Sequence, residues 1–225
     1  MRSLATFFDI WKRNGWRAAL ITAADKVLRP TCACQIVHLV WLPVEKLPAE
    51  TVATDLQCRF LTAEEVESFA ADPANDLEPA LADRLRSGST YCYGAFVNGQ
   101  FAAYGWYALG HIEAEHNFGF PLSLPTDVAY MFKGYSRPEY RGRRLHALAM
   151  AGALRALGPQ GVRALISTVD WTNFASLKSC DRLGYQRIGH LTRYHLGGKE
   201  FTRSPDAAQL HGVQIQATQP VRQVS

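Results

Sequence analysis

A short basic segment in the middle of the chain has the means to bind a phosphate. It reads Y-S-R-P-E-Y-R-G-R-R-L-H over residues 135–146, and apolar side chains then repeat at helical spacing up to Leu157. Pro138 and Gly142 mark a turn between a strand and this helix. The first turn of a helix has N–H groups without intrahelical partners and carries about half a positive charge, so it attracts anions. Arginines in such a turn either add to this site or are an ordinary solvated surface.

Further blocks follow the basic segment in a fixed order. Residues 164–169 form a run typical of a buried strand, and Asn173, Ser176 and the tripeptide Leu183-Gly184-Tyr185 come after it. Together these blocks resemble the GNAT superfamily of acyl-coenzyme A transferases, whose hallmark is V-x-P-x-x-R-G-x-G-x-G/A, then N-x-x-A/S and a closing L-G-F/Y. The resemblance is clearest over residues 127–196 and extends back to about residue 55. It implies an α/β domain with a mixed, mostly antiparallel sheet flanked by helices.

The resemblance also implies a function. A GNAT enzyme transfers an acyl group, most often acetyl, from acetyl-CoA to an amine by direct attack, here an amine of a small-molecule or sugar acceptor. Backbone N–H groups of residues 133–137 would contact the thioester arm. The cofactor-binding residues that the resemblance assigns are Tyr135, Ser136, Arg137, Arg141, Gly142, Arg143, Arg144, Leu145 and His146, together with Asn173 and Ser176 at the next helix.

Two positions depart from the family pattern. Arg144 and His146 occupy the places of the second glycine and of the last Gly/Ala, where bare backbone usually meets the pyrophosphate. A helix start does not need glycine if its side chains point outward, so binding can survive these changes. The alternative is a non-catalytic GNAT-like module with a degenerate active site, which binds CoA or interacts with a protein partner.

The catalytic candidates follow partly from the resemblance. Many relatives place a tyrosine seven residues beyond the motif asparagine as the general acid, and Cys180 stands there in this chain. A thiol pKa of ~8.5, against ~10 for tyrosine, makes protonation of the leaving thiolate feasible, although a small buried cysteine is a common core residue. The candidates for the general base are Glu113, Glu115 and His116, in the loop before the cofactor strand. Ordered water could replace them.

Composition sets broad limits. A chain of 225 residues that is 48% apolar is long enough for one full domain. Five cysteines without a disulfide framework indicate free thiols in a reducing compartment, and Cys32 and Cys34 alone do not form a metal site. We therefore expect a cytoplasmic protein, alternatively one peripheral to the inner face of a membrane.

Charge is divided along the chain. Residues 50–127 contain twelve acidic and three basic side chains, a balance of −9, whereas residues 131–203 contain thirteen basic and four acidic ones, a balance of +9. The basic half coincides with the expected site for the CoA phosphates. Nucleic acid is not expected as a partner, because this half has no recognised binding motif and no cluster of stacking aromatics.

The first thirty residues predict a basic amphipathic helix, interrupted at Asn14-Gly15 and too charged to span a membrane. It either packs on its own domain or docks on a membrane or partner. The expected organisation is this helix over 1–30, a strand and linker over 31–54, the GNAT-like domain over 55–203 and a flexible polar tail over 204–225. Within the domain, Thr62 predicts a helix start, and Asn98-Gly99 predicts a hairpin between strands 91–97 and 100–109.

Overall fold

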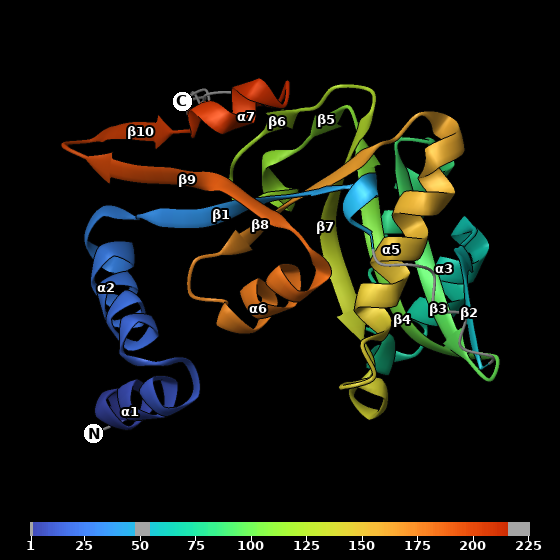
Figure 1. Cartoon of the computed structure of the whole chain (residues 1–225), viewed down its shortest axis with the longest axis horizontal. Coiled ribbons are helices and arrows are strands. Elements are labelled where there is room, and N and C mark those ends of the chain that lie inside the picture. Colours follow the sequence, from blue (N-terminus) through green and yellow to red (C-terminus); the bar gives the residue numbers. More distant parts are fainter. Residues whose placement is uncertain (1, 48–54, 216–225) are drawn as a thin grey trace, which may run out of the picture.

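The computed structural model of the chain describes residues 2–47 and 55–215, and Figure 1 shows their arrangement. The helices are α1 (Arg2–Asn14), α2 (Trp16–Cys32), α3 (Ala63–Ala70), α4 (Leu81–Arg86), α5 (Leu145–Leu157), α6 (Phe174–Leu183) and α7 (Asp206–Leu210). The strands are β1 (Gln35–Pro43), β2 (Leu56–Phe60), β3 (Thr90–Val97), β4 (Gln100–Leu109), β5 (His111–Ile112), β6 (Leu122–Ser123), β7 (Val128–Ser136), β8 (Ala164–Asp170), β9 (Gln186–Leu196), β10 (Lys199–Arg203) and β11 (Gln214–Ile215).

The main sheet has the strand order β10-β9-β1-β8-β7-β4-β3-β2, and a small sheet pairs β11, β6 and β5. Neighbouring strands of the main sheet are antiparallel, except that β7 and β8 run parallel. Helices cover both faces of the sheet (Figure 1). The expected fold class, a mixed and mostly antiparallel sheet flanked by helices, is confirmed.

Alternation along the strands divides the core between the two faces of the sheet. On β1, Val40 and Leu42 belong to the cluster that contains the buried side of α5, whereas Leu39 and Trp41 belong to the cluster that contains Ala208 of α7. Further along the sheet, α3 and α4 pack on the face opposite α5. Helices α5 and α6 therefore pack on the same face of the sheet, and α5 covers most of it.

Local sequence signals define several element boundaries. Thr62 and Glu65 form a reciprocal capping box: the Thr62 hydroxyl accepts from the Glu65 N–H at 3.2 Å, and the Glu65 carboxylate accepts from the Thr62 N–H at 3.0 Å. Asn98 and Gly99 both have positive φ, of 49° and 76°, as a two-residue hairpin turn requires. The expected break at Asn14-Gly15 is also present, because α1 ends at Asn14 and α2 begins at Trp16.

Two expected boundaries were wrong. The strand that was grouped with a linker, β1, lies inside the main sheet between β8 and β9, so the folded domain begins at about residue 35. The tail expected to be flexible from residue 204 is ordered as far as residue 215, since Ala208 and Val213 are buried and β11 pairs with β6. A few small apolar residues suffice here because they fill a gap against Trp41 and the small sheet. Residues 216–225 of the tail lie outside the described part.

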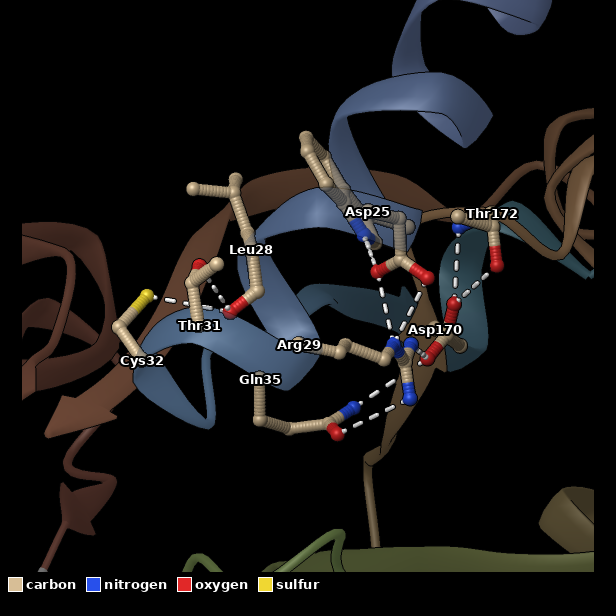
Figure 2. Close-up of polar contacts among 9 residues, drawn as sticks. Asp25, Leu28, Arg29, Thr31, Cys32, Gln35, Asp170 and Thr172 are labelled. Atoms are coloured by element: carbon tan, nitrogen blue, oxygen red, sulfur yellow. Dashed lines mark hydrogen bonds and ion pairs between the residues drawn. The ribbon is translucent and has the colours of Figure 1, made fainter.

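Helix α2 is attached to the domain by a polar network (Figure 2). The guanidinium of Arg29 donates to Asp25 at 2.8 Å and to Asp170, at the end of β8, at 2.5 Å. Burial alone would raise the pKa of Asp170, but hydrogen bonds from Thr172 and Arg29 outweigh burial and hold this pKa below its usual value. The indole of Trp171 donates to Asp25 at 2.6 Å. No helix of the described residues is long and apolar enough to cross a membrane.

A histidine pair across β1 and β9 makes stability depend on pH. The rings of His38 and His190 lie 4.3 Å apart, and burial together with the charges of His190 and Arg187 lowers the pKa of His38 to about 4, against the opposing pull of Asp181 and Asp170. An unfolded histidine titrates near ~6.5, so the unfolded chain takes up more protons as the pH falls below that value. The stability contribution is therefore complete above pH ~6.5 and is lost as the pH falls toward about 4.

We expect His38→Gln to reduce this loss. The drop in unfolding free energy between pH 8 and pH ~4.5 should be smaller by about 1–2 kcal/mol in the variant, after allowance for solvent that reaches the ring. Urea unfolding at both pH values measures the difference. An identical pH dependence in the variant would show that His38 is not the titrating group.

Candidate active site

The parallel strands β7 and β8 separate part-way along their length. Their ladder pairs Val128–Tyr130 with Ala164–Ile166 and then stops, while β7 continues to Ser136 paired with β4. The Ser167 hydroxyl donates to the Met131 carbonyl at 2.8 Å at the point of separation. A bulge shifts the register between β7 and β4 at Phe132, since Trp106 pairs with Lys133 and Tyr107 with Met131. Backbone groups of β7 beyond this point therefore face an opening instead of β8.

A cavity of about 250 Å³ lies in this opening. It is lined by residues 131–134 of β7, residues 167–170 of β8, His146 and Met150 of α5, and Asn173, Ser176, Ser179, Cys180 and Tyr185 at and after the start of α6. Phe118, from the loop between β5 and β6, also lines the cavity. A second hollow of about 210 Å³ adjoins it at the start of α5, between Gly142, Arg144 and Ala147 on one side and Ser179 and Arg182 on the other. His146 contributes to both.

The start of α5 presents backbone donors to this second hollow. Arg144 is the N-cap residue, with φ 60° and ψ 19°, and its carbonyl accepts from the N–H of Leu148. The N–H groups of the residues between them belong to the first turn, which has no intrahelical acceptors. Gly142 also has positive φ, of 82°. The turn thus has the shape that glycine adopts most easily, although an arginine occupies its last position.

The fold of the chain is similar to that of solved structures. A GCN5-related N-acetyltransferase from Kribbella flavida superposes with a TM-score of 0.50 at 18% identity, over 73% of this chain and 61% of that chain. The chain has the GNAT fold. A functionally unknown conserved protein from Staphylococcus epidermidis superposes with a TM-score of 0.50 at 12% identity, over 77% of this chain and 67% of that chain. No protein-family model matches the sequence. No curated protein matches it either.

Three of the arginines assigned to the GNAT phosphate turn already have partners. Arg143 donates to Asp55 at 2.7 Å, and Arg137 pairs with Asp72 at 3.2 Å and with Glu139 at 2.7 Å. Arg141 donates to the carbonyl of Ser136 at 3.3 Å and lies over the Tyr135 ring. The remaining one, Arg144, is exposed and lines the hollow at the start of α5. Arg144 is therefore the arginine of this turn best placed to meet an anion there.

The side chains of other residues assigned from the motif have partners within the fold. The Tyr135 hydroxyl donates to the Ala74 carbonyl at 3.0 Å, and its ring packs with the cluster on the face opposite α5. Leu145 is buried in the core on the α5 face. At the start of α6, Asn173 lines the cavity and caps the helix, since its side-chain oxygen accepts from the Ser176 N–H at 3.1 Å.

His146 projects into the opening from the first turn of α5. A Cβ built on Gly134 would overlap Cε1 of His146, so the imidazole packs directly against the bare backbone of β7. Burial lowers the pKa of His146, and a hydrogen bond to the backbone of Tyr104 only partly opposes this, which leaves the ring neutral at neutral pH. Its Nδ1 is shielded from solvent and has no hydrogen-bond partner among the described residues. A rotation of the ring away from Gly134 would let Nδ1 bond a group in the cavity.

The contact between Gly134 and His146 gives a direct test of this geometry. Gly134→Ala should destabilise the protein by about 1–3 kcal/mol, because the new methyl group overlaps the imidazole. Most of this penalty should disappear in a His146→Ala background, since the flexible Met131 side chain is then the main remaining neighbour. Urea unfolding of the four proteins measures the coupling. Equal penalties in both backgrounds would mean that the imidazole does not lie against Gly134.

Cys180 and Tyr185 share one wall of the cavity. Burial raises the pKa of the half-buried Cys180 thiol to about 11, so it stays protonated near neutral pH. The buried Tyr185 hydroxyl donates to the Met150 sulfur at 3.5 Å, and burial raises its pKa as well. Tyr185 was not among the residues expected to act in the site, although the Leu-Gly-Tyr motif that contains it was the signal available.

The two candidate bases whose side chains the structure describes, Glu113 and His116, lie outside the cavity lining. Glu113 is exposed and lines a separate hollow of about 460 Å³ with Arg84 and Ser89. The His116 ring packs on Phe132 at 4.8 Å between centroids, and Phe132 in turn lines the cavity. The side chain of Glu115 lies outside the described part. Of Glu113 and His116, His116 therefore lies nearer to the cavity, because only the Phe132 ring separates it from the opening.

A buried polar network fixes the loop beside the cavity. The Asn117 oxygen accepts from the Tyr130 hydroxyl at 2.8 Å and from the Thr168 hydroxyl at 2.5 Å, and its amide donates to the Phe120 carbonyl at 2.6 Å. This network joins the loop to β7 and β8 at their point of separation and holds Phe118 at the cavity. The sequence contained no signal for it, because the three partners are brought together only by the sheet.

Proposed function

We propose that the protein is an acyltransferase that moves an acyl group, most simply acetyl, from acyl-CoA to an amine. The observation that carries this proposal is the opening between β7 and β8, which holds a cavity and adjoins the start of α5. Strand backbone without a neighbour on one side, a helix N-terminus and a basic turn lie around two adjoining hollows that share His146 and Ser179. A long ligand with a phosphate at one end fits this combination.

The residues present fit acyl-CoA. The N–H groups at the start of α5 and the exposed Arg144 would hold the pyrophosphate. Residues 131–134 of β7 offer backbone groups to the pantetheine and thioester, and Asn173 lies on the opposite wall. The unpartnered, shielded Nδ1 of His146 supports a polar ligand in the cavity, because a buried nitrogen without a partner is costly. Bound acyl-CoA supplies an activated carbonyl with a thiolate leaving group.

The chain supplies proton transfer at this site. Neutral His146 is the candidate to accept the proton of the attacking amine, once its ring turns from Gly134 to present the shielded Nδ1 to the cavity. Cys180 can donate a proton to the departing thiolate, since its thiol is protonated and lines the same cavity. Backbone N–H groups of β7 can hydrogen-bond the carbonyl oxygen as charge develops on it. The amine acceptor is proposed to be a small molecule or an amino sugar.

The decisive measurement is calorimetry with acetyl-CoA, followed by a screen of amino sugars, amino acids and polyamines for CoA release. We expect micromolar binding, and CoA release with at least one class of amine. The two side chains at family glycine positions, Arg144 and His146, favour a second candidate, a CoA-binding module without catalysis. Binding without CoA release by any amine would support that candidate, and absence of binding would refute both.

A further inference from the structure

The first two helices form a hairpin that projects from one corner of the molecule. In Figure 1, α1 and α2 lie apart from α3, α4 and α5, and α1 packs against α2. The hairpin is fixed to the domain at defined points: Arg29 bonds Asp170 at 2.5 Å, and Lys178 of α6 donates to Asn14 at 2.9 Å. Its orientation relative to the domain is therefore set by the fold.

The outer face of α2 is apolar. Trp16, Leu20 and Val27 are 58%, 52% and 60% exposed. Their spacing of four and seven residues places them in a single row along the helix, which we call the apolar stripe. Ala18 and Ala19 lie on the other side and are buried. On α1, Phe8 and Trp11 are roughly half exposed, and their rings lie 5.9 Å apart.

Basic side chains accompany the apolar stripe. Lys12, Arg13, Arg17 and Lys26 are all exposed, and none of them forms an ion pair with any residue that the structure describes. The acid at the base of α2, Asp25, is bonded by Arg29 and Trp171. Arg17 and Lys26 fall on the two sides of the row that contains Trp16, Leu20 and Val27. The hairpin thus presents the apolar stripe and Trp11, with basic side chains on both sides of the stripe.

This combination indicates the kind of partner. A second copy of the chain would bring two cationic borders together, and an apolar protein groove would leave the cations without counter-charges. An anionic phospholipid bilayer satisfies both features, since acyl chains receive the apolar stripe, headgroups pair with the lysines and arginines, and tryptophan prefers the interface. We propose that the α1–α2 hairpin is a docking surface for an anionic membrane, on which the protein lies without crossing it.

Sedimentation of the full-length protein with vesicles tests this proposal. We expect binding to vesicles of phosphatidylcholine mixed with phosphatidylglycerol, weak or no binding to pure phosphatidylcholine, and loss of binding at high salt. Tryptophan fluorescence should shift to the blue on binding, because Trp11 and Trp16 are exposed whereas Trp41 and Trp106 are already buried. Absence of binding to the anionic vesicles at low salt would overturn the proposal.

Two variants separate the apolar and electrostatic contributions. Neutralising Arg13, Arg17 and Lys26 to glutamine should weaken binding roughly 100-fold, at about fivefold for each cation near the surface. Trp16→Glu together with Leu20→Glu should abolish it. The matched control is Leu196→Glu, which changes a 66% exposed leucine on β9 and should bind vesicles like the wild type.

The alternative occupants predict different outcomes. If the apolar stripe joins two copies of the chain, ultracentrifugation without lipid will show a dimer that Trp16→Glu with Leu20→Glu dissociates, and this would overturn the proposal. Equal loss of vesicle binding in the Leu196→Glu control would also overturn it, because any exposed leucine would then suffice. Urea unfolding of every variant should have a midpoint close to that of the wild type, which confirms that each is folded without relying on the acyltransferase proposal.

Discussion

Arg144→Glu is expected to weaken CoA binding about 100-fold, with little loss of thermal stability. In this turn Arg143 and Arg137 are engaged with Asp55, Asp72 and Glu139, so Arg144 is the arginine of the turn that lines the hollow at the start of α5, across from Arg182. Reversing its charge replaces one charge-assisted hydrogen bond by repulsion of the pyrophosphate, which together amount to about 3 kcal/mol. Exposed turn charges contribute little to folding.

Two further variants sharpen this prediction. Arg144→Gly restores the residue that the GNAT pattern has here and removes a positive-φ arginine, so it should raise stability by about 1 kcal/mol while weakening binding less than Arg144→Glu. Arg143→Glu is the matched control, because the side chain of Arg143 already bonds Asp55. Calorimetry with CoA ranks the three proteins. A larger effect from Arg143 than from Arg144 would contradict the assignment of the phosphate site.

Cys180→Ala is expected to lower kcat by ~10²-fold and to leave acetyl-CoA affinity nearly unchanged. The assay uses an amine substrate identified by the screen for CoA release. General acids contribute about 10²–10⁴-fold, and the lower end applies here. The reason is that burial raises the pKa of Cys180 to about 11, above that of a typical leaving thiol at ~8.5, so proton transfer from it is uphill. Steady-state kinetics separate the effect on kcat from the effect on KM.

Cys58→Ala is the matched control for this second prediction. Cys58 is also half-buried and also has a raised pKa through burial, but it lies on β2, away from the cavity lining. It should keep full kcat. Cys180→Tyr should retain more activity than Cys180→Ala if a proton donor is needed at this position. If the thiol only fills space, alanine will be nearly silent and tyrosine will destabilise the protein by about 1–3 kcal/mol.

Much of the local structure could be read from neighbouring residues. The Thr62 capping box, the Asn98-Gly99 turn and the Asn173 cap all depend on side chains and φ angles within about four positions of each other. The strand, basic turn and helix around residues 135–157 were predictable for the same reason, and the order of these blocks led to the GNAT fold. Both partners of such a cap or turn lie in the same short segment, so the segment's own sequence is enough to predict it.

The working arrangement of the site depended on contacts between distant segments. Arg143 bonds Asp55, 88 residues away, which leaves Arg144 as the arginine of the turn that lines the hollow at the helix start. His146 turns toward Gly134 because β7 and α5 pack together there, and Asn117 joins two strands that only the sheet places side by side.

By itself, the sequence determined several helices, among them α3 and α5, the strands β3, β4 and β8, and the basic turn, because short-range capping, turn geometry and periodicity specify them. The tertiary structure alone decided that β1 enters the sheet between β8 and β9 and that the segment around Ala208 and Val213 packs on the domain. It also decided which side chains reach the cavity. Strand order and side-chain partners in a sheet follow from burial and hydrogen bonding summed over segments far apart in sequence, and no local pattern contains that information.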